Sequence, residues 1–180
     1  MTPIKSYDKL KNVAMVIIIV DIDELRVIAA EAMCNKDYSL ASQMLEKITD
    51  LDVCDFDAYH KKGVAYLLIN KLIDAEIALI KANAIQPHNA NINNNLGVLY
   101  EKKQAYDLSI HHYERAIEIN PEATDYLVNL AHTHKLRNDS SSAIKCYLRA
   151  LNIDANNIQI LSSLGLLYRS CNRNTDALET

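Results

Sequence analysis

Residues 90–123 read ANINNNLGVLYEKKQAYDLSIHHYERAIEINPEA, and a unit of this length recurs along the chain. The three glycines are separated by 34 and then 68 residues: Gly63, Gly97 and Gly165. Two of the three prolines, Pro87 and Pro121, keep the interval of 34. Because glycine and proline are scarce here and both have strong backbone preferences, their shared interval indicates an internal repeat.

Counting seven residues back from each glycine divides the chain into consecutive units without any insertion. These units are 22–55, 56–89, 90–123, 124–157 and an incomplete 158–180. Within a unit the apolar residues recur at helical spacing in two bursts, which a polar turn separates. The sequence therefore predicts an all-α protein built from stacked antiparallel helix pairs, each too small to be stable alone.

Small residues occupy position 8 of every unit, where Ala29 and Ala131 stand in the two units without glycine. We expect this position to let the paired helices approach closely. Proline at position 32 follows the second helix, where a residue without an N–H ends a helix at little cost.

The third unit shows the full pattern: Leu96, Gly97, Tyr100, Ser109, Tyr113, Ala116 and Pro121. A length of 34 with these residues at these positions resembles the tetratricopeptide repeat (TPR), over roughly residues 22–180. The resemblance implies a right-handed superhelical solenoid whose first helices line a concave groove for an extended peptide. The frequent Trp at position 4 is absent, and Asn93 stands there in the third unit.

The resemblance also implies which positions point into the groove, namely 2, 5, 6, 9, 12 and 13. The groove residues predicted on this basis are Lys61, Val64, Asn95, Val98, Lys102, Asn129, His132, Lys135, Ser163 and Arg169.

Asn95 and Asn129 both stand at position 6, one repeat apart. An amide can donate and accept, so it can hold a peptide backbone without reading side chains. The pair is similar to the asparagine ladder in the TPR region of O-linked N-acetylglucosamine transferases, although Asn at this position is common in TPR sequences generally. Lys61 and Ser163 interrupt the ladder on either side.

Lys102, Lys135 and Arg169 would form a basic stripe along the groove, which either attracts an acidic peptide or is simply a solvated face. The pairs His111–His112 and His132–His134 diverge around a helix and do not have metal-ligand spacing. We predict no catalytic residue, metal or cofactor within this chain, since no P-loop, GxGxxG or nucleophile elbow is present.

The composition is that of a globular protein, and the net charge of −4 argues against a nucleic-acid partner. The four cysteines lie far apart without a CxxC pair, which favours reduced thiols and a cytoplasmic protein. Val13 to Val20 is an apolar run of eight residues, too short to span a membrane. We expect residues 1–21 to dock on the first repeat.

The last unit stops at Thr180, so its second helix would only open, at Asp176 and Ala177. A solenoid usually finishes with a polar capping helix. The chain is therefore either a fragment or a homo-oligomer that pairs through its uncapped C-terminal repeat.

Two functions follow from these observations. The first is a protein-interaction scaffold that binds a protein or peptide, acidic or extended, in the concave groove without catalysis. The alternative is the substrate-recognition arm of a larger enzyme, such as a glycosyltransferase, whose catalytic domain would follow residue 180.

Overall fold

The computed structural model describes the backbone of residues 21–178 and the side chains of residues 21–171. Within residues 21–178 every regular element is a helix, as the sequence predicts. The predicted docking of residues 1–21 on the first repeat falls almost entirely outside the described residues. The helices are α2 (Ile22–Cys34), α3 (Tyr38–Leu51), α4 (Phe56–Leu68), α5 (Leu72–Ile85), α6 (Ala90–Lys102), α7 (Tyr106–Ile119), α8 (Thr124–Leu136), α9 (Ser140–Ile153) and α10 (Ile158–Leu178).

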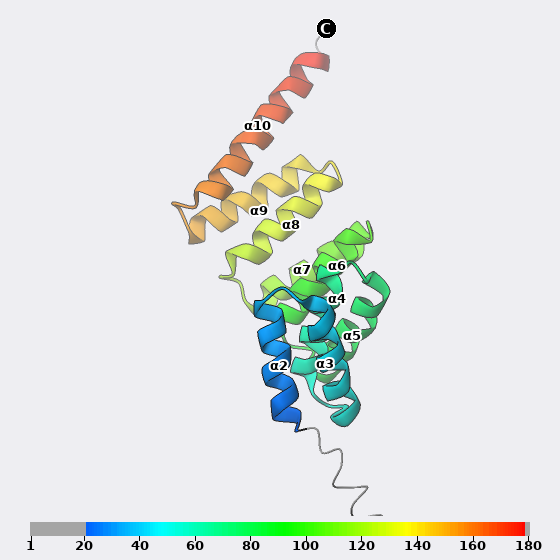
Figure 1. Ribbon diagram of the computed structural model, residues 1–180. Coiled ribbons are helices and arrows are strands. Elements are labelled where there is room, and N and C mark those ends of the chain that lie inside the picture. Colours follow the sequence, from blue (N-terminus) through cyan, green and yellow to red (C-terminus); the bar gives the residue numbers. More distant parts are fainter. Residues whose placement is uncertain (1–20, 179–180) are drawn as a thin grey trace, which may run out of the picture.

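Consecutive helices pack as antiparallel pairs, and the pairs stack into an all-α superhelix (Figure 1). The first helix of each pair also packs against the second helix of the preceding pair. The buried residues therefore form a chain of small clusters that each bridge neighbouring repeats.

Local sequence accounts for where the helices begin. Asp37, Asp55 and Asp139 each precede a helix, and their carboxylates accept a hydrogen bond from a backbone N–H in its first turn. Asn89 caps α6 in the same way, by accepting from the N–H of Ile92. Helices α5 and α7 end at Ile85 and Ile119, two residues before the prolines that were predicted to follow them.

The turn within each pair has a feature that the repeat pattern did not predict. One residue per turn adopts a left-handed backbone with φ near +60°, and these residues are Lys36, Asn70, Gln104 and Asn138. They stand 34 residues apart, and none is glycine. The left-handed residue ends one helix and reverses the chain, so that the next helix can begin two residues later.

Position 8 provides the close approach between paired helices that the sequence predicts. A Cβ atom at Gly97 would lie 2.5 Å from the Tyr113 ring, and one at Gly63 would lie 2.6 Å from Leu79. No side-chain carbon fits in this space, so the aromatic or leucine of the second helix packs directly on the glycine backbone. Gly165 differs, because nothing described lies within 4 Å of its Cβ position.

The end of the chain differs from the expected turn before Asp176. Residues 158–178 form one continuous helix, α10, which extends away from α9 (Figure 1). Continuing the helix instead satisfies the backbone hydrogen bonds of this segment.

Candidate functional site

Neighbouring first helices are joined by polar side chains at two adjacent positions of the repeat. The Asn95 amide nitrogen on α6 lies 2.7 Å from Nε2 of His60 on α4. One repeat later, the Asn129 amide on α8 donates to Oδ1 of Asn94 on α6 over 3.0 Å. Position 6 of one repeat thus bonds to position 5 of the repeat before it, and the half-buried amides form a regular series.

Burial determines the direction of the first of these hydrogen bonds. It lowers the pKa of His60 below its usual value; Asp57 raises this pKa and Lys61 lowers it to smaller extents. The imidazole is therefore neutral near pH 7, and its Nε2 atom accepts a hydrogen bond from the Asn95 amide. The side-chain oxygens of Asn95 and Asn129 accept no hydrogen bond among the described residues, so both amides retain an acceptor.

A second set of contacts links α6 to α8. The Tyr126 hydroxyl donates to Oδ1 of Asn91 over 2.6 Å, and the Thr133 hydroxyl donates to Glu101 over 2.6 Å. The same Glu101 oxygen lies 3.2 Å from Nδ1 of His132. His132, a predicted groove residue, is thus held against the preceding repeat.

The remaining predicted residues differ in exposure. Lys102, Lys135 and Arg169 are exposed, whereas Val64 and Val98 are half-buried between helices. Ser163 donates to the backbone oxygen of Gln159 within α10. Lys135 and Leu166 border a hollow of about 400 Å³ between α8 and α10.

An apolar pocket of about 260 Å³ lies between α2 and α4. Its apolar lining comes from three helices: Ala29, Ala30 and Met33 of α2, Leu45 and Ile48 of α3, and Ala58 of α4. Arg26, Asp57 and Lys61 complete the lining. Of the predicted groove residues, Lys61 borders this pocket.

Two alanines leave the space that this pocket occupies. Position 3 holds Ala58 in this pair, whereas Ile92 and Tyr126 occupy it in the next two repeats. At position 9, Ala30 stands where the next two repeats have Val64 and Val98. The smaller side chains leave space that larger ones fill elsewhere.

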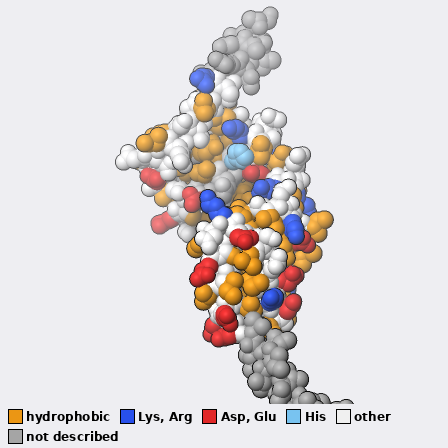
Figure 2. All heavy atoms as spheres, viewed as in Figure 1, with side chains coloured by type: hydrophobic (Ala, Val, Ile, Leu, Met, Phe, Trp, Pro, Cys, Tyr) orange, Lys and Arg blue, Asp and Glu red, His pale blue; other side chains and the backbone are white. Residues whose placement is uncertain are grey.

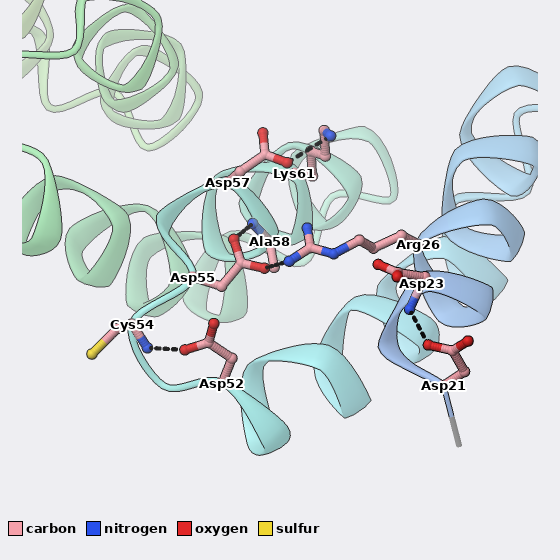
Figure 3. Close-up of polar contacts among 9 residues, drawn as sticks. All are labelled: Asp21, Asp23, Arg26, Asp52, Cys54, Asp55, Asp57, Ala58 and Lys61. Carbon is pink, nitrogen blue, oxygen red and sulfur yellow. Dashed lines mark hydrogen bonds and ion pairs between the residues drawn. The ribbon is translucent and has the colours of Figure 1, made fainter. Parts of the chain in front are cut away.

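The charged residues at the rim of the pocket, Arg26, Asp57 and Lys61, are joined in ion pairs. Arg26 reaches from α2 to Asp55 over 2.6 Å, and Lys61 pairs with Asp57 over 2.7 Å (Figure 3). Asp21, Asp23 and Asp52 lie close by on the same end of the molecule (Figure 3). The lower part of the molecule accordingly shows hydrophobic side chains bordered by acidic ones (Figure 2).

Sequence reasoning missed His60 and Asn94, which hold the two predicted asparagines, because position 5 carries different residue types. It also missed the pocket, although the paired alanines at positions 3 and 9 are a readable signal. A buried polar network was missed as well. The Asn93 amide donates to the backbone oxygen of Asn89, and its Oδ1 lies 3.3 Å from Nδ1 of His112.

His112 in turn stacks on Tyr100, with ring centroids 5.4 Å apart. Burial lowers the pKa of His112 to about 4, with a smaller contribution from His111. Asn93 occupies the position where tryptophan is frequent in the family. The amide and imidazole together fill that space with a hydrogen-bonded pair in place of one large ring.

Among the described residues, no group of three or more His, Cys, Asp or Glu side chains is arranged to hold a metal ion. No helix in the described residues is long and apolar enough to cross a membrane. Cys34 and Cys54 are exposed thiols, whereas burial raises the pKa of Cys146 to about 11.

Comparison with known proteins agrees with this architecture. Residues 90–122 and 124–157 match the tetratricopeptide repeat family. The anaphase-promoting complex subunit CDC16 of Saccharomyces cerevisiae is 30% identical over 113 residues, which are 59% of this chain and 14% of that protein. The BBSome complex member bbs-4 of Caenorhabditis elegans is 28% identical over 120 residues, or 66% of this chain and 26% of that protein.

Among solved structures, a crystal structure of MamA superposes with a TM-score of 0.76 at 21% identity. The match covers 88% of this chain and 86% of the MamA chain, and it shows the shared fold. The chain thus spans only a small part of the curated relatives, and nearly all of a solenoid of known structure.

Proposed function

Since this chain is a tetratricopeptide repeat protein, we propose that it binds an extended segment of a partner protein along the surface of its first helices. The chain assembles proteins and performs no catalysis of its own. The relatives that it resembles are named as members of multi-protein complexes, which supports a scaffolding role.

The pocket between α2 and α4 is the observation that carries this proposal. A volume of about 260 Å³ with an apolar lining accommodates one large apolar side chain. Its rim carries Asp57 together with the paired Arg26 and Lys61. Such a site anchors a peptide by a buried apolar residue.

The half-buried amides on α6 and α8 supply the second element of recognition. Asn95 and Asn129 stand one repeat apart, and each retains an acceptor oxygen that can take a hydrogen bond from a peptide N–H. Each such bond contributes about 1 kcal/mol, so the asparagines orient the segment while the pocket provides most of the affinity.

Charge along the face gives the bound segment a direction. The α2–α4 end carries acidic side chains, whereas Lys102 and Lys135 are exposed further along. An acidic partner residue therefore belongs at the α6–α8 end, and a basic or neutral one belongs beside the pocket.

Filling the pocket tests the proposal with residues that the protein already uses. The variant Ala30→Val/Ala58→Ile copies Val64 and Ile92 of the next two repeats, so it should fold normally. A photo-crosslinking residue at position 61 would capture the partner in cells that express the chain. We expect the captured partner to be lost from the pocket-filled variant.

Gln43→Val, an exposed apolar substitution on α3, is the matched control and should retain capture. Asn95→Ala and Lys135→Ala should weaken capture without abolishing it. If the pocket-filled variant, Asn95→Ala and Lys135→Ala all captured the partner as the unaltered chain does, binding on this face would be wrong.

No observation favours the substrate-recognition arm of a glycosyltransferase over a scaffold. The similarity of Asn95 and Asn129 to the asparagine ladder of O-linked N-acetylglucosamine transferases stays a prediction. The cytoplasmic location and self-association through the C-terminal repeat are likewise predictions. Sequencing the native gene beyond residue 180 tests directly whether a glycosyltransferase domain follows.

A further inference from the structure

Helix α5 carries an exposed apolar stripe that the binding face does not use. Ile73, Ile77 and Ile80 are 74%, 65% and 49% exposed, and Ala84 continues the row. In Figure 1, α5 lies at the outer edge of the superhelix.

The stripe is specific to one repeat. The same positions hold Ser39, Gln43 and Glu46 in α3, and Asp107, His111 and Glu114 in α7. The opposite face of α5 is buried and also apolar, through Ala75, Ala78, Leu79 and Ala82. A helix with apolar side chains on two opposite faces normally has both of them covered.

The spacing of the stripe is that of a helix–helix seam. Intervals of four, three and four residues join Ile73, Ile77, Ile80 and Ala84, which are the core positions of a coiled coil over two turns or more. Asp74 and Lys81 flank this seam on one side, at the positions that form interhelical ion pairs.

These two charges favour a second copy of the same helix in antiparallel orientation. In that orientation Asp74 of each helix faces Lys81 of the other, so a two-fold axis near Ile77 generates the ion pair twice. A parallel arrangement would instead pair Lys81 with Glu76, but Glu76 already binds Lys103 over 2.6 Å. The charges therefore complement an antiparallel copy.

We propose that the chain self-associates through antiparallel packing of α5 against α5 of a second copy, on the outer face of the superhelix. A stable dimer buries about 800 Å² per partner. One face of a single helix buries less than this area, so we expect the association to be weak. The first-helix face stays free in the dimer, which would display two such faces.

Analytical ultracentrifugation of the full chain from about 5 to about 500 µM tests this arrangement in the range expected for a small interface. We expect a reversible monomer–dimer equilibrium. Ile77→Gln/Ile80→Glu, which installs the residues of α3, should leave only monomer. Val27→Gln and Leu166→Gln remove exposed apolar side chains on α2 and α10, and both should dimerise as the unaltered chain does.

Charge reversal tests the orientation. Asp74→Lys alone should weaken dimerisation about tenfold, because it turns two attractive pairs into repulsive ones. The double variant Asp74→Lys/Lys81→Asp should restore it.

Three results would overturn the proposal. One is a monomer at every concentration, as expected if another segment of the chain covers α5. Another is dimerisation that only Leu166→Gln abolishes, and the third is a double charge reversal no better than the single one. None of these measurements involves the partner of the first-helix face, so the two proposals can fail separately.

Discussion

Single residues set the distance between paired helices in this protein. Gly97 and Gly63 have no space for a side chain, whereas Gly165 at the same repeat position has nothing described within 4 Å. Single buried polar residues also matter, because Asn93 of α6 and His112 of α7 are hydrogen-bonded to each other. Both features predict measurable changes in stability.

Replacing glycine by alanine should therefore have opposite effects at two equivalent positions. In Gly97→Ala the new carbon would meet the Tyr113 ring at 2.5 Å, which should cost about 1–3 kcal/mol through overpacking. In Gly165→Ala it meets open space, and the higher helix propensity should stabilise α10 by up to about 1 kcal/mol. Urea unfolding of both variants measures the difference, and equal effects would contradict the packing argument.

The buried imidazole predicts how stability depends on pH. The pKa of His112 is about 4 in the folded protein against 6.5 for the free side chain. Between these values the unfolded chain binds more protons, so the free energy of unfolding should fall as the pH falls from 6.5 towards 4. The loss should reach about 2 kcal/mol, less than the full shift implies, because the side chain is only partly buried.

Denaturant unfolding at a series of pH values checks this expectation. His112→Gln should reduce the slope in that window, although the lowered pKa values of His60 and His134 leave part of it. His111→Gln, at the exposed neighbouring residue, should keep most of the slope. An unchanged slope in His112→Gln would show that His112 is not held neutral.

At the scale of the element, the two helices of each pair are joined by a turn that contains one residue in the left-handed conformation. Asn tolerates that conformation, and it occupies the position in two of four turns. Gln104 and Lys36 adopt it at a cost of about 1–2 kcal/mol, because their Cβ atoms crowd the backbone. The α6–α7 turn is therefore strained.

Relieving this strain should stabilise the protein. Gln104→Gly should raise the free energy of unfolding by about 0.5–1 kcal/mol, since the gain exceeds the added flexibility of the unfolded chain. Gln104→Ala retains a Cβ atom and should give no gain. Thermal unfolding of the two variants distinguishes these cases, and equal melting temperatures would argue against strain at this residue.

The whole molecule is stabilised between neighbouring repeats, without a single central core. One buried cluster runs from α4 to α6 and another from α7 to α10, so each joins consecutive pairs along the superhelix. Stability should therefore be highest where a pair has neighbours on both sides. The superhelix also separates the first-helix face, which we propose binds a partner segment, from the α5 stripe, which we propose binds a second copy.

Hydrogen exchange should reveal this distribution. Amides of α6, α7 and α8 should exchange most slowly, and those of α10, which packs mainly against α9, most rapidly among the described helices. Gly97→Ala should accelerate exchange in α5 and α8 as well as in its own pair. Equal protection in all helices would mean that the chain unfolds as one unit.

The sequence by itself determined the all-α repeat architecture and the position of the close contact at Gly97. It could do so because helix periodicity, glycine and proline act through the backbone within one repeat. It also identified Asn95, Asn129 and Lys61 as candidates for the binding face, and their role in binding remains a prediction.

The tertiary structure alone decided that residues at position 5 hydrogen-bond to these asparagines and that a pocket opens beside Lys61. It also decided that Ile73, Ile77 and Ile80 are exposed. Each of these features depends on how side chains of neighbouring helices fill the space between them, and no spacing within a single repeat specifies that volume.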